Sequence, residues 1–375
     1  VMKKIMIALL VLSSVNAFAT KARMKALSSS FHLADTQTIY TSPYQLFSFK
    51  DFVALESGAQ TPTGADDGAE GAVLFSISDE ARLFVSLGHK DEAVQNERKF
   101  LNAVDTVTFK TQQNPLEVMY GMKMDGSTYG IGFFYSQFKD KVADNNESSN
   151  GIRVGGAHGD FKWKVNLGLT NKVQNTTDGT LTGNPYTNVA LRYNMNTLRY
   201  GLDYVAWDVK RSSTADVEVS SHSFQNIKLQ VVDTQAKDGH EFFYGAALDQ
   251  TNLKNKLSIT DKALTRLALP VWIGVETTAN DWLTLRASIK QSVLLAQSKD
   301  ENGYAATSTS GVDGAFGAVT EYSAEPNNTV AAFGAGLRWN QLTVDGTLSG
   351  LTGGSANQKI DATNLLAQVG MTYNY

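Results

Sequence analysis

Lysines and arginines recur on one side of alternating segments in this chain. Four of them lie between Lys162 and Arg199, and three more lie between Arg266 and Lys290. Cations on the wall of a narrow, low-dielectric space raise the local concentration of anions. The pattern therefore predicts a basic surface that attracts small anions. The residues expected to line it are Lys162, Lys164, Arg192, Arg199, Arg266, Arg286, Lys290 and Arg338.

The histidines do not indicate catalysis. The chain has five, and none combines with a serine and an acid as a triad requires, or with another ligand at metal-binding spacing. We therefore predict no catalytic residue, no metal site, no cofactor and no enzymatic activity. The formal charge of −4 also argues against a general nucleic-acid-binding protein.

The last eleven residues show which elements position the basic side chains. Apolar and mostly polar residues alternate without a break from Leu365 to Tyr375, as in a strand with one face toward lipid and one toward a lumen. Val369, Met371, Tyr373 and Tyr375 share the apolar face. This ending resembles the C-terminal insertion signal of Gram-negative outer-membrane proteins, with Tyr375 where the family more often has Phe. The resemblance implies the bacterial outer membrane as location, and its lipids and the barrel-insertion machinery as partners.

The first nineteen residues have the pattern of a secretory signal peptide. Lys3 and Lys4 precede an apolar run from Ile5 to Leu12, and Ala17-Phe18-Ala19 supplies the small residues that a signal peptidase requires. A single membrane anchor is the alternative, but this apolar run is shorter than the roughly 20 residues of a spanning helix. We expect residues 1–19 to be removed, residues 20–46 to form a periplasmic N-terminal segment, and residues 47–375 to form one barrel.

Alternation and turn residues predict an antiparallel, up-and-down transmembrane β-barrel, an all-β fold. Seven short turns alternate with eight longer polar stretches, which gives about sixteen strands, with fourteen or eighteen as alternatives. A soluble all-β fold also alternates. It does not explain why aromatic residues gather near the short turns. The predicted short turns are at Asp79-Glu80, Asp125-Gly126, Gly159-Asp160, Asn194 to Asn196, Asp238-Gly239, Asn280-Asp281 and Asn340.

The inward faces of the predicted strands carry twelve basic and six acidic residues, although the whole chain is acidic. This balance predicts a weak preference for anions. Two long stretches, His89 to Asn114 and Gln297 to Asn328, could fold inward and narrow the pore, and exposed loops are the default expectation for both. The acids that could then face the basic wall are Asp300, Glu301 and Asp313.

The segment after the signal resembles two known families. The span from Asp35 through Ile39-Tyr40 to Pro43 and Leu46 is similar to the N-terminal hatch of fatty-acid-transport channels, with Ser42-Pro43-Tyr44 in place of their Asn-Pro-Ala. That resemblance implies a plugged barrel for hydrophobic compounds. Together with the last strand, the segment also resembles the porin-like major outer-membrane proteins of predatory deltaproteobacteria, which implies an abundant passive barrel.

The sequence therefore favours a porin-like channel for passive diffusion of small hydrophilic solutes. A channel for hydrophobic compounds and a structural or adhesive barrel are the alternatives. Porins are often trimers, so a homotrimer is the assembly to test for such a channel.

Overall fold

The computed structural model describes residues 20–57, 69–105, 107–140, 145–257, 260–299, 329–352 and 366–375. Its strands are β1 (Phe52–Ser57), β2 (Glu70–Ser78), β3 (Ala81–Leu87), β4 (Leu116–Met124), β5 (Ser127–Asp140), β6 (Asn145–His158), β7 (Phe161–Asn175), β8 (Gly179–Gly183), β9 (Thr187–Met195), β10 (Leu198–Ser212), β11 (Glu218–Lys237), β12 (His240–Leu257), β13 (Thr260–Asn280), β14 (Leu283–Lys299), β15 (Thr329–Trp339), β16 (Leu342–Thr352) and β17 (Leu366–Asn374). The helices are α2 (Lys21–Ala26), α3 (Thr36–Ile39), the 3-10 helix η1 (Pro43–Ser48) and α4 (Glu92–Asp105). No helix among these residues is long and apolar enough to cross a membrane.

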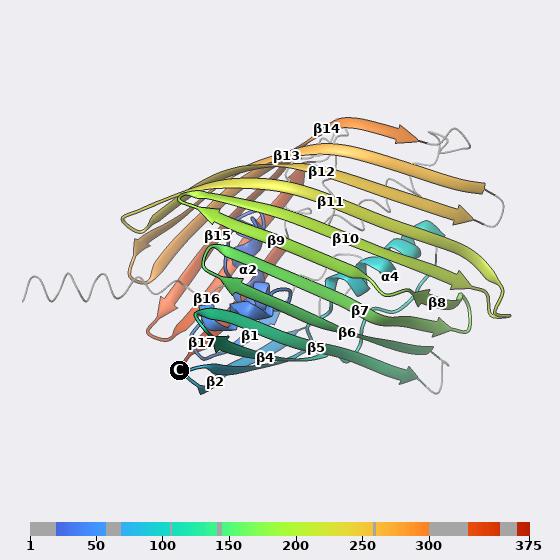
Figure 1. Ribbon diagram of the computed structural model, residues 1–375, viewed down its shortest axis with the longest axis horizontal. Helices are drawn as coiled ribbons and strands as arrows, with labels where there is room; N and C mark the ends of the chain where they lie inside the picture. The colour runs from blue at the N-terminus through green and yellow to red at the C-terminus, as the bar shows by residue number, and fades with distance from the viewer. Residues whose placement is uncertain are drawn as a thin grey trace, which may run out of the picture.

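The strands form one closed antiparallel barrel (Figure 1). β8 and β9 both lie between β7 and β10, so they are two pieces of one interrupted strand. Pro185 lies in the interruption, where the ladder needs no N–H donor. Sixteen strand positions result, and β1 closes the barrel by pairing with β17. The predicted fold and the predicted strand number are confirmed.

Short turns gather at one end of the barrel, which we call the short-turn end. Asp125, Asn196, Asp238 and Asn340 each have a positive φ near 50° there. Asp and Asn tolerate this left-handed conformation, which matches the twist of a tight hairpin. The opposite end, the loop end, differs from the expectation.

At the loop end, four of the eight longer polar stretches have shorter connections than the sequence predicts. These stretches are Lys139 to Glu147, Gln174 to Gly183, Ser212 to Ser221 and Thr251 to Leu264. Strands continue through much of each stretch, so that β11 has 20 residues and β13 has 21. About 9 to 11 tilted residues suffice to cross a membrane. Outside the membrane both faces of a hairpin meet water, so the polarity alternation fades while backbone pairing continues.

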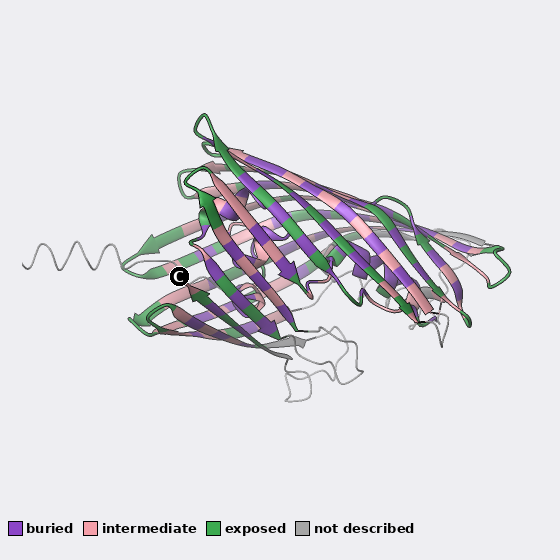
Figure 2. Ribbon diagram, turned by 90° about the horizontal axis from the view of Figure 1, so that it is seen from below, coloured by how far each residue is buried: buried purple, intermediate pink, exposed green. Residues whose placement is uncertain are grey.

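Inward and outward faces alternate as the last strand predicts (Figure 2). Met371 and Tyr373 are exposed on the outer face, whereas Thr372 between them is buried in the barrel. The outer surface is a belt of large apolar side chains, and exposed aromatic residues such as Tyr193 and Trp339 flank its short-turn end. A closed barrel with such a belt is the structure that a bacterial outer membrane requires.

A charge placed on either face of β11 tests this assignment. Leu229 is 54% exposed on the outer face, and Gln230 lies on the inner face beside Asp203. Leu229→Arg should lower the free energy of unfolding by about 2 to 4 kcal/mol, because lipid cannot solvate a guanidinium group. Urea unfolding of the refolded barrel in lipid vesicles measures this. Gln230→Arg is the matched control, and an equal loss in both variants would contradict the assignment.

Candidate functional site

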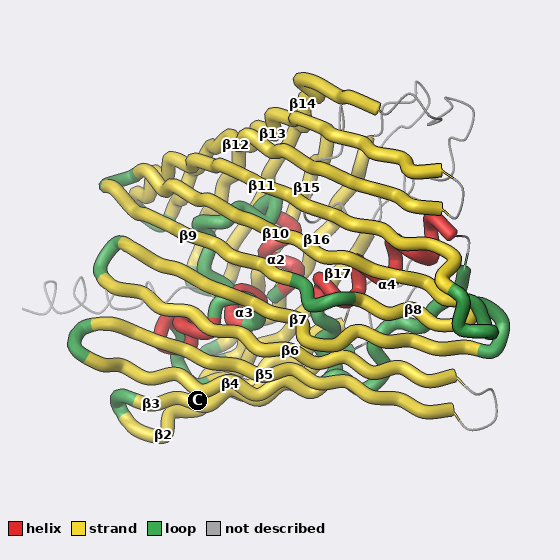
Figure 3. Tube along the Cα trace, turned by 45° about the vertical axis from the view of Figure 1, so that its right-hand side comes forward, coloured by secondary structure: helices red, strands yellow, loops and turns green. Residues whose placement is uncertain are grey.

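The N-terminal segment, residues 20–51, lies inside the short-turn half of the barrel (Figure 3). Ile39 and Leu46 are fully buried in a cluster with the inward Phe84. Leu27 packs in a second cluster that contains Trp272. Each fully buried side chain of this size contributes roughly 1.5 to 3 kcal/mol, so hydrophobic burial holds the segment in the lumen.

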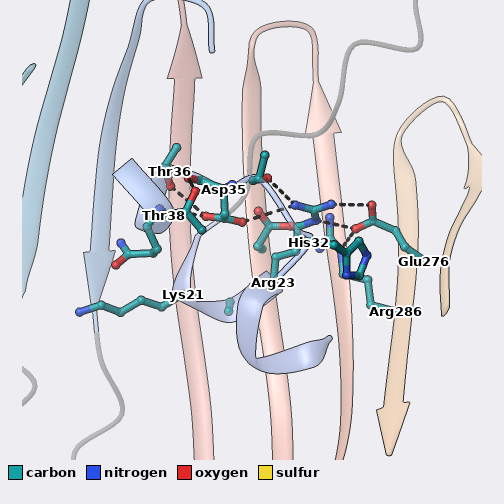
Figure 4. A network of polar contacts seen from close by, with 12 residues as sticks. Lys21, Arg23, His32, Asp35, Thr36, Thr38, Glu276 and Arg286 are labelled. Atoms are coloured by element: carbon teal, nitrogen blue, oxygen red, sulfur yellow. Dashed lines mark hydrogen bonds and ion pairs between the residues drawn. The ribbon is translucent and has the colours of Figure 1, made fainter. Parts of the chain in front are cut away.

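A row of ion pairs joins α2 to the wall (Figure 4). The guanidinium group of Arg23 donates to both carboxylate oxygens of Glu276, at 2.7 and 3.0 Å. Glu276 also accepts from Arg286 at 2.5 Å, and Arg286 reaches Asp345 at 2.5 Å. Arg286, predicted to line the pore, is therefore used within the barrel to hold the N-terminal segment.

Asp35 is the N-cap of α3 and is completely buried. Its carboxylate accepts a hydrogen bond from the backbone N–H of Gln37 at 3.1 Å and lies 3.6 Å from the guanidinium group of Arg23. Burial raises the pKa of Asp35 to about 7, although Arg23 and the hydrogen bond act in the opposite direction and Asp345 adds to the rise. We therefore expect the docking of the N-terminal segment in the barrel to depend on pH near neutrality.

This raised pKa predicts that the N-terminal segment is held more tightly in acid. A carboxyl that protonates near pH 7 in the folded state and near 3.9 when exposed favours docking at low pH. The contribution of Asp35 protonation to the free energy of docking declines by about 1.4 kcal/mol per pH unit as the pH rises between those values. It is absent above about pH 7. Limited proteolysis at Lys21 or Lys25 should therefore become faster as the pH rises over this range, because the segment is held less tightly.

The matched variant for the pH test is Asp35→Asn, which preserves the cap and removes the titration. Its proteolysis rate should depend less on pH than that of the unsubstituted protein. An identical pH dependence in both proteins would assign the effect to other groups.

A second element, the loop segment of residues 88–115, also folds into the lumen and carries α4. The expectation that His89 to Asn114 is an exposed loop is therefore wrong. Asp91 caps the helix by accepting from the N–H of Val94 at 2.9 Å. Phe100 is fully buried and its ring lies 5.3 Å from that of Trp207 on β10. Recurrent apolar residues after an Asp cap were the sequence signal for this amphipathic helix.

Buried charges fix the orientation of α4. Arg98 donates to Glu147 at 3.0 Å and to Asn171 at 2.9 Å, and all three side chains are buried. At the end of the helix, a carboxylate oxygen of Asp105 lies 3.2 Å from Nε2 of His222. A buried ion pair is costly to break, because the remaining charge has no partner.

Arg98→Ala should therefore release the loop segment. We expect a loss of about 3 to 5 kcal/mol, since the buried Glu147 would lose its cationic partner. Hydrogen exchange of residues 92–105 measures the release. Lys99→Ala is the matched control because Lys99 is exposed on the same helix. Unchanged protection in Arg98→Ala would show that apolar packing alone holds α4.

The two inserted segments contact each other. The ring of Tyr40 stacks on that of His89 with 3.5 Å between centroids. Arg153 on β6 donates to the backbone carbonyl of Tyr40, and it pairs with Asp91 at 2.8 Å and with Glu117 at 2.7 Å. A continuous packed structure thus runs from the short-turn end toward the loop end on this side of the lumen.

A cavity of about 400 Å³ remains at the short-turn end, between the N-terminal segment and the wall from β4 to β10. We call it the basic cavity. Four predicted residues, Lys162, Lys164, Arg192 and Arg199, line it together with Lys123. No aspartate or glutamate is among its lining residues.

The other predicted residues lie elsewhere. Arg266 is buried on β13, Lys290 lies on β14 facing inward, and Arg338 on β15 donates to the carbonyl of Asn340 at 3.3 Å. Asp300, Glu301 and Asp313 lie outside the described residues, as do residues 1–19. The N-terminal segment continues past the predicted boundary at residue 46, and the first strand begins at Phe52.

A hydrogen-bonded row of Ser30, His32 and Glu241 has the residue types of a hydrolase triad. The Ser30 hydroxyl lies 2.9 Å from His32, and His32 lies 3.1 Å from Glu241. Ser30 is 3% exposed, accepts from the indole N–H of Trp272 and does not line the basic cavity. The hydrogen bonds of Ser30 and His32 therefore join the N-terminal segment to Glu241 and Trp272 of the barrel wall. Among the described residues, no group of three or more His, Asp or Glu is arranged to hold a metal.

The chain matches no protein-family model and no curated protein by sequence. Among solved structures it is similar to a bacterial polysaccharide outer membrane secretin, with 11% identity, 87% of this chain and 98% of that chain covered, and a TM-score of 0.43. It is also similar to the toluene transporter TodX of Pseudomonas putida, with 10% identity, 96% of this chain and 99% of that chain covered, and a TM-score of 0.39. A triple mutant of the Rhodopseudomonas blastica porin is similar as well, with 10% identity, 87% of this chain and 99% of that chain covered, and a TM-score of 0.32. These distant likenesses carry no inference about function.

Proposed function

We propose that this protein is an outer-membrane channel for passive diffusion of small hydrophilic solutes, with a preference for anions. The observation that supports this function best is the basic cavity, whose lining contains five lysines and arginines and no carboxylate. Cations at a channel mouth concentrate anions and repel cations. The inserted segments make the path narrower than a barrel of this size would otherwise leave.

A channel for hydrophobic compounds is the second candidate, and a specific observation favours it. The N-terminal segment occupies the barrel as a plug, and α4 packs in an apolar cluster with Trp207, Phe224 and Leu253. That cluster is closely packed by protein side chains, and the cavity beside the N-terminal segment is basic. We therefore rank hydrophilic anions above hydrophobic compounds.

Planar-bilayer conductance of the refolded protein tests the proposal. We expect ohmic steps and a reversal potential that reports anion preference in a salt gradient. Arg192→Glu with Arg199→Glu should shift the reversal potential toward cation selectivity, because both side chains line the basic cavity. Lys237→Glu is the matched control, since Lys237 is exposed at the end of β11.

Three outcomes contradict the anion channel. An unchanged reversal potential in the double variant would remove the basic cavity from the path. Absence of conductance together with uptake of a hydrophobic compound would favour the second candidate. Absence of both would favour a structural or adhesive barrel.

A further inference from the structure

Neighbouring strands place the cations of the basic cavity in one row. Lys123 on β4 pairs with Thr128 on β5, and Thr128 pairs with Ala157 on β6. The row then continues through Ala157 to Lys162 on β7 and from Lys162 to Arg192 on β9. Small side chains in the middle of the row leave room, and long cationic side chains stand at both sides of it.

Lys162 and Arg192 are direct cross-strand partners on the inner face. Like charges directly opposite each other destabilise a sheet. Arg192 pairs with Asp203 at 2.6 Å, which neutralises one charge. Within the described part of the chain, Lys162 and Lys164 make no ion pair or hydrogen bond, and Arg199 donates only to backbone carbonyls. The row therefore has more positive than negative charge, although Asp160, Asp203 and Glu92 lie near enough to attract its two lysines.

The opposite side of the cavity adds neutral donors. Tyr44 and Ser48 of the N-terminal segment line it, together with Ser42, which is hydrogen-bonded to Tyr44, and Thr41, whose hydroxyl donates to the carbonyl of Thr38 at 3.4 Å. The Tyr44 hydroxyl is protonated at neutral pH, as an ordinary tyrosine is, and burial raises its pKa further. Lysine and arginine on one side and hydroxyl groups on the other are the donors that phosphate and carboxylate oxygens accept from.

We propose that the basic cavity is a binding site for a small multivalent oxyanion, such as an organic phosphate or a polycarboxylate. This inference deepens the proposed function by naming the solute class. A single negative charge would leave most of the row unbalanced, whereas two or three charges match it. The volume of about 400 Å³ lies within the usual range for small-molecule sites.

Calorimetric titration of the full folded chain in a non-ionic detergent tests the site. Inorganic pyrophosphate is the probe, at constant ionic strength maintained with sodium chloride. We expect saturable binding of one pyrophosphate per barrel that chloride does not replace. Lys162→Gln should weaken binding roughly ten- to hundredfold, since one charge-assisted hydrogen bond is lost. Lys237→Gln, at the exposed end of β11, should bind as the unsubstituted protein does.

Lys164→Gln is a second variant with the same expected loss, and it decides the test if Lys162→Gln does not fold. Folding is checked by the heat-dependent shift of the barrel in gel electrophoresis. Absence of saturable binding overturns the site, and so does equal affinity in a folded lysine variant and the unsubstituted protein.

The titration needs no membrane current, so the two proposals fail separately. Binding without conductance keeps the site and removes the channel. Conductance with anion preference but without pyrophosphate binding keeps the channel and removes the site.

Discussion

Every backbone N–H and C=O group that faces lipid must find a partner within the protein, and the rest of this structure depends on that constraint. The pairing of β1 with β17 meets it by closing the sheet into a barrel. Closure also imposes strict alternation between lipid and lumen on each strand. Within the membrane a charged residue is therefore acceptable only at every second position, and Lys162, Lys164, Arg192 and Arg199 share the inner side.

A barrel of sixteen strand positions is too wide to be filled by its own wall side chains. Two segments occupy much of this space on the described side. Both combine apolar packing with buried ion pairs, as in Arg23 with Glu276 and Arg98 with Glu147. Such pairs contribute little net stability relative to apolar contacts, but breaking one leaves an unpaired charge. The ion pairs therefore favour one position of each segment in the barrel over other positions that would bury a similar apolar area.

The inward cations consequently have two different roles. Arg153 and Arg286 are surrounded by carboxylates and join inserted segments to the wall. Lys162 and Lys164 face a cavity whose lining has no carboxylate. The same residue types on the same face thus form internal supports in one region and an anion-attracting surface in another.

The amino-acid sequence is enough to predict the barrel, its approximate strand number and the inward or outward faces of its membrane-spanning strands. These properties depend on a period of two and on short turns, which are local. It also placed Lys162, Lys164, Arg192 and Arg199 near one another, because neighbouring strands in a meander are neighbours in the barrel.

The interior was decided by contacts between residues far apart in the chain. Arg23 and Glu276 are 253 positions apart, so no local pattern could show that Arg286 is committed to a carboxylate. The same holds for α4, whose amphipathic pattern is compatible with an exposed loop until the barrel supplies Trp207 as its partner. Local periodicity thus specifies the wall, and tertiary packing alone decides which of its charges remain available to a solute.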